Sequence, residues 1–426
     1  MYICKRLKGV VLIAILCMTY GTDTKAHNLL KWQQHSEAEV LNQVEPVVEW
    51  EKYDDVTGYE VWQMTSYDAG AWATHFNTQS FTPDDRYLIF SSERTGSWQL
   101  FRVELNSGEI LQLTNLRSLS SSSFTVHPNG EEVYFGFDGK LGRVNIYTGE
   151  ISSREFEEPV TFRRVISSDG HYTTVSSYDG ERSTIYLISL PDAEIEAKLH
   201  WPSGETLGTY LEWTGSISHT MINPGYPWLV SFLPGSTHAE ETQYFDHQRD
   251  MSLPKKLRAR VWIWDARNGE VRPLVSMPYH YSNTHESWSR DGERFFFFQK
   301  HAPGWIPNHI ASVNKSGKDW QNHHSDDTLR LGHGTPSYDG KWFISDGQNG
   351  GHNPLRLINL ETGKWKDLCW PNASIYPGHS EQAHVHPSFS SSGNFVAYTS
   401  DKTGSPEVYV VPIPQELKNR LSQSDE

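Results

Sequence analysis

The sequence predicts an all-β protein folded as a seven-bladed β-propeller. The chain of 426 residues contains 16 Trp, 20 Tyr and 18 Phe, yet only 37% of its residues are hydrophobic. This composition favours many short strands joined by polar turns. A unit of turn, strand, loop and strand, closed by a second turn, also recurs seven times along the chain. Repeats of about 40 to 50 residues that hold four strands each are typical of propeller blades.

Each repeat opens on a turn similar to Ser-x-Asp-Gly. One four-stranded sheet cannot bury both of its faces, whereas a closed ring of sheets can. Two stacked β-sandwiches would not produce turns that recur in phase, so we favour the ring. We expect Thr57–Thr65 to add an outer strand to the last blade, and Pro234–Leu257 to form a loop over one mouth of the ring. The repeats are Phe81–Glu109, Val126–Glu150, Ile166–Glu194, and those that begin at Ile222, Trp288, Pro336 and Phe389.

The N-terminus is typical of an export signal. Basic residues at positions 5, 6 and 8 precede an apolar run, Gly9–Tyr20, and Ala26 ends an acceptable cleavage site. The run is too short to favour a membrane-spanning helix. Cys17 would allow a lipid anchor, although Leu16 before it fits that motif poorly. We therefore expect an exported protein, periplasmic or secreted, divided into a signal peptide (1–26), a lead-in (27–50), the propeller (51–415) and a polar tail (416–426).

The charge of the chain limits its partners. A formal net charge of −15 argues against nucleic acid, because such proteins carry a basic footprint. An anionic substrate is still possible, since a basic pocket can lie inside an acidic protein. The chain also holds 20 His against 3 Cys. Histidine binds metals and titrates near neutral pH, so the positions of these residues indicate where chemistry takes place.

Four histidines share one position in their repeats. Each lies four residues before the first residue of the blade's turn, on the expected innermost strand; these are His219, His285, His333 and His386. The third repeat has Arg163 at this position. Even spacing keeps the position facing one way in every blade, provided that no bulge intervenes. We expect these side chains to converge at the central channel, although buried histidines can also simply fill a polar axis.

His384 adds a fifth imidazole to this group. It lies two residues before His386, so both side chains would project from one face of a strand. Glu381 or Gln382 could supply an oxygen ligand nearby. Three imidazoles with one oxygen suit Mn, Fe, Co, Ni or Zn, and the pattern does not choose among them. On the first blade, His75 and Gln79 are candidates for lining the same channel and contacting substrate, with surface or core roles equally open. His333 of the sixth repeat is also a candidate for contacting substrate.

Several of these segments resemble the oligogalacturonate lyases, a family of seven-bladed propeller polysaccharide lyases. The resemblance extends from about Thr57 to Pro414, and its most specific pieces are the Thr-His-Glu-x-Trp and His-x-His-Pro-Ser-Phe motifs. The similar segments are NTQSFTPDDRYLIFSSERTG, ISHTMINP, NTHESWSRDGERFFFF, GHGTPSYDGKWFISDGQ and QAHVHPSFSSSGNFVAYTSDKTGSPEVYV. The blade turns alone are less specific, because TolB-like propellers share them.

The resemblance implies roles for individual residues. It implies that His285, His384 and His386 bind a divalent metal, usually Mn²⁺ in this family. The family's fourth ligand is a glutamine at the position of Glu381, with Gln382 beside it here. His219 falls at the position of the proposed base. The family also uses an arginine upstream of this histidine; the register points to Arg163, and rough alignment points to Arg182.

The implied reaction is β-elimination on a uronate-containing oligo- or polysaccharide. Predicted export, the insertion in the fourth repeat and Glu381 all depart from the family pattern, so ulvan or a rhamnogalacturonan-like glycan is an alternative to oligogalacturonate. A second class of function is that of a non-catalytic, TolB-like binding propeller, for which no converging histidines are expected. A third is the propeller half of a prolyl-peptidase-like enzyme, which would need a hydrolase domain that this sequence lacks.

Overall fold

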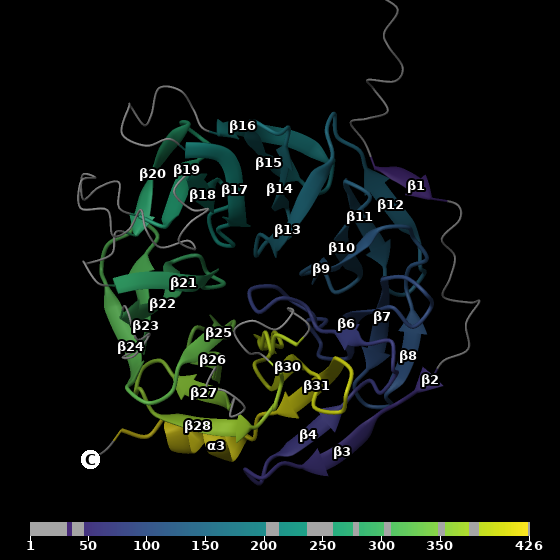
Figure 1. Ribbon diagram of the computed structural model, residues 1–426, viewed down its shortest axis with the longest axis vertical. Coiled ribbons are helices and arrows are strands. Elements are labelled where there is room, and N and C mark those ends of the chain that lie inside the picture. Colours follow the sequence, from purple (N-terminus) through teal and green to yellow (C-terminus); the bar gives the residue numbers. More distant parts are fainter. Residues whose placement is uncertain are drawn as a thin grey trace, which may run out of the picture.

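The computed structural model arranges the strands in a ring of seven sheets around a central axis (Figure 1). It describes residues 32–35, 47–201, 213–236, 259–275, 281–301, 308–347, 354–374 and 383–424. The prediction of an all-β, seven-bladed propeller is confirmed. The predicted signal peptide, Cys17, and residues 237–257 of the predicted insertion lie outside the described residues. Among the helices of the described residues, none is long and apolar enough to cross a membrane.

Blades one to three follow the chain from the axis outward, and N-terminal segments add a fifth strand to the first two. Blade one comprises β5 (Ala71–Trp72), β6 (Tyr87–Ser92), β7 (Gln99–Glu104), β8 (Glu109–Gln112) and β2 (Val47–Val48). Blade two comprises β9 (Leu119–Val126), β10 (Glu132–Phe137), β11 (Lys140–Asn145), β12 (Ile151–Arg154) and β1 (Gln33–His35). Blade three comprises β13 (Val160–Ile166), β14 (Tyr172–Tyr178), β15 (Ser183–Ser189) and β16 (Glu194–Trp201).

Blades four to six have four strands each. Blade four comprises β17 (Trp213–Ile222), β18 (Leu229–Ser236), β19 (Val261–Asp265) and β20 (Glu270–Val275). Blade five comprises β21 (Tyr281–Trp288), β22 (Arg294–His301), β23 (Asn308–Asn314) and β24 (Gln321–Asp326). Blade six comprises β25 (Leu331–Pro336), β26 (Trp342–Gly347), β27 (Leu355–Asn359) and β28 (Trp365–Cys369). Labels β9, β13, β17, β21 and β25 mark the strands nearest the axis (Figure 1).

Blade seven joins the two ends of the chain. It comprises β29 (Ser388–Phe389), β30 (Phe395–Ser400), β31 (Glu407–Pro412), β4 (Glu60–Gln63) and β3 (Glu51–Asp54). Tyr409 and Val410 of β31 pair with Gln63 and Trp62 of β4, which confirms that the Thr57–Thr65 segment closes the ring. Helix α3 (Gln415–Leu421) follows, and its residues Leu417 and Leu421 are buried.

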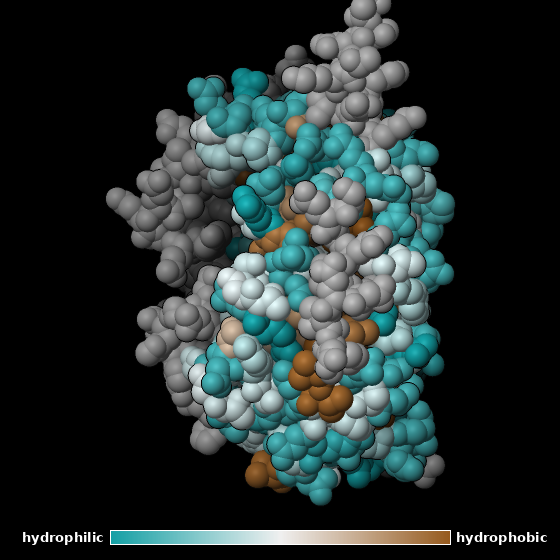
Figure 2. All heavy atoms as spheres, turned by 90° about the vertical axis from the view of Figure 1, so that its right-hand side faces the viewer, coloured by the Kyte–Doolittle hydropathy of each residue, from teal (hydrophilic) through white to brown (hydrophobic). Residues whose placement is uncertain are grey.

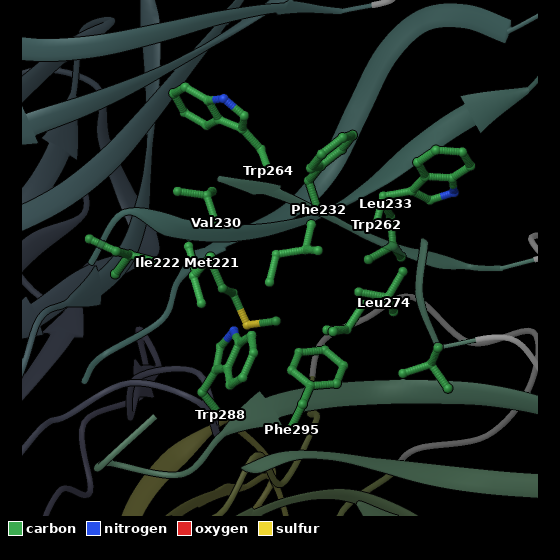
Figure 3. Packing of buried hydrophobic residues seen from close by; sticks show 14 of the residues in the cluster. Met221, Ile222, Val230, Phe232, Leu233, Trp262, Trp264, Leu274, Trp288 and Phe295 are labelled. Atoms are coloured by element: carbon green, nitrogen blue, oxygen red, sulfur yellow. The ribbon is translucent and has the colours of Figure 1, made fainter. Parts of the chain in front are cut away.

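Apolar side chains fill the spaces between blades. Figure 3 shows Trp262 and Trp264 of β19 in the same cluster as Trp288 and Phe295 of blade five. The indole of Trp288 also donates a hydrogen bond to the Ser231 hydroxyl across the two blades, at 3.1 Å. Large aromatic side chains bury much apolar surface per residue, so a few of them bind neighbouring sheets together. By contrast, the outer face in Figure 2 is mostly hydrophilic.

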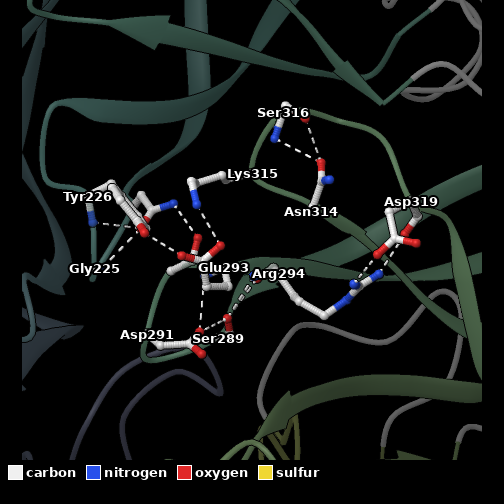
Figure 4. A network of polar contacts seen from close by, with 12 residues as sticks. Gly225, Tyr226, Ser289, Asp291, Glu293, Arg294, Asn314, Lys315, Ser316 and Asp319 are labelled. Carbon is white, nitrogen blue, oxygen red and sulfur yellow. Dashed lines mark hydrogen bonds and ion pairs between the residues drawn. The ribbon is translucent and has the colours of Figure 1, made fainter.

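The turn of blade five shows why the Ser-x-Asp-Gly pattern recurs. The Ser289 hydroxyl donates to an Asp291 carboxylate oxygen at 2.6 Å, and that oxygen also accepts the Glu293 N–H at 3.0 Å (Figure 4). Gly292 follows with a φ of +72°, in the left-handed region that favours glycine. The side-chain amide of Asn223, from the turn of blade four, donates to the Gly292 carbonyl at 2.9 Å. The turns of adjacent blades are thus hydrogen-bonded to each other.

Gly292→Ala should lower the free energy of unfolding by about 2 to 5 kcal/mol, which denaturant titration measures. The left-handed backbone conformation costs alanine roughly 1–2 kcal/mol, and crowding adds roughly 1–3 kcal/mol. A Cβ at this position would lie 1.9 Å from the Asn223 side-chain oxygen. Gly340→Ala is the matched control, because its φ is +68° and a Cβ there would meet nothing within 4 Å. Equal destabilisation by both variants would show that the contact between blades contributes nothing.

Candidate metal centre and active site

A cavity of about 730 Å³ opens at the axis of the ring, and every blade contributes to its wall. Phe76 lies among the imidazoles of this cavity, with its ring centre 5.6 Å from that of His333, 5.8 Å from that of His386 and 6.3 Å from that of His285. The residues that line it are Trp72, Ala73, His75, Phe76, Ser121, Ser122, Arg164, His219, Arg260, Thr284, His285, Lys300, Arg330, His333, His384 and His386. We call this cavity the axial pocket.

A repeated distortion of the inner strands positions several of these side chains. Arg164, His219, His285 and His386 all have positive φ, at 69°, 48°, 53° and 43°. The first three lie where the pairing register of their strand shifts, in β13, β17 and β21. Positive φ is uncommon for residues other than glycine, and bulges of this kind re-aim a side chain. The expected convergence required inner strands without bulges, whereas the side chains converge because several blades carry a distortion at a similar place.

Three histidines in the axial pocket form a cluster suited to a metal ion. One ligand atom from each of His333, His384 and His386 lies within 4.8 Å of the others. Burial lowers the pKa of His333 and of His386 well below the usual range, so both imidazoles are neutral and keep a lone pair for coordination. The Nδ1 atom of His384 is buried and has no hydrogen-bond partner among the described residues. A buried ring nitrogen without a hydrogen-bond partner, beside two neutral imidazoles, is suited to binding a divalent transition metal.

The other residues predicted to bind metal have different positions. His285 lies beside the cluster, with its ring centre 4.2 Å from that of His333, and its Nδ1 is 3.0 Å from the Gly332 carbonyl oxygen. Its ligand atoms are not part of the three-histidine group. Glu381 and Gln382 lie outside the described residues. His333, which the sequence indicated as a substrate contact, is a member of the cluster.

Basic side chains form another part of the pocket wall. Three are arginines, and burial lowers the pKa of the fourth, Lys300, to about 7, so that it is partly charged at neutral pH. Arg164, Arg260, Lys300 and Arg330 line the axial pocket, and no Asp or Glu among the described residues does so. Glu286 is buried beside this wall, where its carboxylate accepts a 2.7 Å bond from Arg260 Nε. Low-dielectric walls of one charge concentrate the electric field, so the pocket attracts anions despite the net charge of the chain.

His219 is the histidine that was predicted to act as the catalytic base. It lines the pocket, its side chain is exposed to the pocket's solvent, and its Nδ1 is 3.1 Å from the Ser218 hydroxyl. Solvent reaches His219 only inside the pocket, so the surrounding wall still partly desolvates the imidazole; this desolvation, and then the charge of Arg260, lower the pKa of His219 below its usual value. The imidazole is therefore neutral at pH 7 and able to accept a proton.

The two arginines predicted to bind carboxylate do not line the pocket. Arg163 instead donates from Nε to the Ser176 hydroxyl at 2.9 Å, while its neighbour Arg164 lines the pocket and donates to the Ser122 carbonyl at 3.0 Å. Arg182 lies in the exposed turn between β14 and β15, and its backbone N–H donates to Asp179 at 2.6 Å.

The two residues of blade one that were predicted to line the channel lie in different cavities. His75 lines the axial pocket, and its ring centre is 4.6 Å from that of His386. Gln79 lines a second cavity of about 60 Å³, where its amide donates to the Tyr338 hydroxyl at 2.8 Å and to the Ser391 hydroxyl at 3.1 Å. The sequence allowed a basic pocket but identified none of the arginine and lysine residues that line it. Arg260 and Arg330 each directly precede a strand, outside the repeated position, so no period in the sequence marks them.

Comparison with known proteins finds relatives that match nearly the whole chain. No family model matches it. An oligogalacturonide lyase from Pectobacterium atrosepticum is 23% identical over 406 residues, which cover 86% of this chain and 96% of that protein. An oligogalacturonate lyase from Dickeya dadantii is 22% identical over 400 residues, which cover 85% and 96%. A Tol-Pal system protein TolB from Francisella tularensis is 30% identical over 78 residues, 18% of each chain.

A solved structure agrees with the observed architecture. The oligogalacturonate lyase in complex with manganese has a TM-score of 0.70 and 20% identity, over 91% of this chain and 99% of that one. It supports the propeller fold. The resemblance to the oligogalacturonate lyases that the sequence motifs indicated is thus confirmed over most of the chain.

Proposed function

We propose that this protein is a metal-dependent carbon–oxygen lyase that cleaves uronate-containing oligo- or polysaccharides, such as oligogalacturonate, by β-elimination. The observation that carries the proposal is the axial pocket, which combines three clustered imidazoles, a separate neutral histidine and a cationic wall. Relatives that match 85% or more of the chain are named as oligogalacturonide or oligogalacturonate lyases. We further propose, from residues 1–26, that the protein is exported to the periplasm or secreted.

His333, His384 and His386 would hold the metal, and manganese is the first ion to test because the similar solved lyase is a manganese complex. A divalent cation bound there would offset the charge of the uronate carboxylate and of the enolate-like state that follows. Arg164 and Arg260 lie on the pocket wall, where their guanidinium groups can bind a carboxylate through paired hydrogen bonds. These interactions orient the sugar and make its C5 proton more acidic.

His219 would act as the base. Its neutral imidazole accepts the C5 proton, and the electron pair of the broken C5–H bond forms the C4–C5 double bond. The C4–O4 bond breaks in the same elimination with its electron pair on O4, this oxygen takes up a proton from solvent, and His219 then releases the C5 proton to solvent. The products are a shortened saccharide and a 4,5-unsaturated uronide, and no water is consumed. Neither Arg163 nor Arg182 is assigned to this step, because neither lines the pocket.

Two alternatives lead to different experimental results. A lyase for another uronan, such as ulvan or a rhamnogalacturonan-like glycan, would use the same residues on a different sugar. A non-catalytic, TolB-like propeller gives no reason for three histidine ligand atoms to lie within 4.8 Å of one another beside a cationic wall. The cluster therefore favours the lyase over the binding module.

A panel of uronans tests the proposal. Purified protein with Mn²⁺ is incubated with oligogalacturonate, polygalacturonate, ulvan and rhamnogalacturonan, and the ultraviolet absorbance of unsaturated uronides is followed. We expect product from at least one of them, with oligogalacturonate favoured. Product from ulvan alone would support the alternative substrate. Protein that binds Mn²⁺ but yields no unsaturated product from any uronan would contradict the proposal.

A further inference from the structure

One buried carboxylate holds a histidine of the metal cluster at two points. Asp346 lies on β26, the second strand of blade six, and is fully buried. One of its oxygens accepts the backbone N–H of His333 at 2.6 Å. The other lies 3.0 Å from Nδ1 of the same histidine. The contacts fix both the main chain and the ring of His333 on the adjacent strand β25.

This arrangement determines which ring nitrogen of His333 can bind a metal. Burial raises the pKa of Asp346 to about 7, so its carboxyl group is ionised above that pH. The ionised carboxylate only accepts hydrogen bonds, which places the hydrogen of the neutral imidazole on Nδ1, where it is donated to Asp346. The lone pair is then on Nε2. Histidines that bind metals commonly donate their other ring N–H to a carboxylate, which fixes the tautomer and makes the ligand more basic.

We propose that His333 is a ligand of the metal and that Asp346 is the positioning residue that sets its tautomer and orientation. The inference rests on the proposed function, because it assumes that the axial pocket holds a divalent cation. It gives His333 a role different from the substrate contact that the sequence indicated. It also adds blade six to the site, beside His384 and His386, whose ligand atoms lie within 4.8 Å of that of His333.

The Asp346→Asn variant is the direct test, and Mn²⁺ affinity is the measurement. The amide has nearly the shape of the carboxylate but keeps one acceptor. If that oxygen stays on the His333 backbone N–H, the NH₂ group faces Nδ1, so the ring hydrogen moves to Nε2 and the lone pair there is lost. We expect the dissociation constant for Mn²⁺ to rise about 10- to 100-fold, as for other outer partners of metal-binding histidines. The electron paramagnetic resonance signal of free Mn²⁺ follows the titration without any substrate.

Glu407→Gln is the matched control. Glu407 is also buried, at 1% exposure, but its carboxylate accepts hydrogen bonds from the hydroxyls of Thr65 and Ser405 instead of a histidine. Removing its charge should leave the Mn²⁺ dissociation constant within about twofold of the wild type. Thermal unfolding of both variants without metal shows whether either change acts through stability alone.

Further variants separate the possible outcomes. If Asp346→Asn does not fold, His333→Ala decides, with an expected loss of more than tenfold in affinity. Wild-type Mn²⁺ affinity in folded Asp346→Asn would overturn the inference. So would a His285→Ala variant that loses Mn²⁺ while His333→Ala still binds it. Neither result would contradict the lyase proposal. A wild-type protein that binds no Mn²⁺ but cleaves a uronan would contradict the inference and the metal requirement. One that neither binds Mn²⁺ nor cleaves any uronan would contradict the proposed function itself.

Discussion

Replacing His219 with alanine should lower kcat on the uronan substrate by about 100- to 10,000-fold, the usual contribution of a positioned general base. The imidazole lines the axial pocket but is not one of the three clustered histidines, so its loss removes the proton acceptor and leaves the cluster intact. The carboxylate-binding wall also stays, so KM should change little. Initial rates from the absorbance of the unsaturated product give both constants.

The pH profile of the wild type gives a second measure of the same group. Burial, and then Arg260, lower the pKa of His219 from the ordinary 6.5. A base loses activity as the pH falls through its own pKa, so the acidic limb of kcat/KM should lie below pH 6.5. A limb above that value would mean that a different group, or a protonated His219, controls the rate.

His309→Ala is a suitable control for the His219 variant. Its Nδ1 lies 2.7 Å from the Ser325 hydroxyl, between strands β23 and β24, and it does not line the pocket. We expect wild-type kcat from this variant. Mn²⁺ affinity should be unchanged in His219→Ala, because removing the base leaves the metal ligands in place. Full activity in folded His219→Ala would exclude it as the base.

The fold could be predicted because its signals are local and repeated. The turns of repeats three, five and six combine a hydroxyl, an Asp and a glycine at fixed spacing, and the other turns vary this pattern. Gly292 of repeat five has the positive φ that the spacing implies. Strand alternation between these turns then leaves few arrangements other than a ring. The closing strand was also predictable, because β4 is a strand that precedes the first complete repeat and pairs with β31 of the last one.

The site was less predictable, because its geometry depends on backbone distortion and on residues outside the repeated position. Counting back from each turn selected Arg163, yet the positive φ lies at Arg164, and Arg164 lines the pocket. A shift of one residue moves a side chain to the opposite face of a strand, so an unrecognised bulge changes the answer. Likewise, the partnership of Asp346 with His333 joins two strands, and no pattern within either strand reveals it.

His386→Ala should remove most of the activity, because the variant loses a ligand of the proposed metal centre. Its ring centre lies 4.4 Å from that of His333 and 5.0 Å from that of His384, and those two centres are 5.1 Å apart. Metal stabilisation of transition-state charge is worth several kcal/mol, so kcat/KM should fall about 1,000-fold or more. Metal analysis of the purified protein should show about one Mn²⁺ per chain in the wild type and little in the variant.

Chelation distinguishes loss of metal from loss of fold. Wild-type protein treated with a chelator should lose activity to a similar extent and regain it when Mn²⁺ is added, whereas His386→Ala should not recover. His171→Ala is the control, because this histidine lies in an exposed turn and does not line the pocket. Activity that persists after complete chelation would show that the cationic wall alone stabilises the developing charge. The histidine cluster would then act by orienting substrate, and the role of His386 would have to be sought in KM.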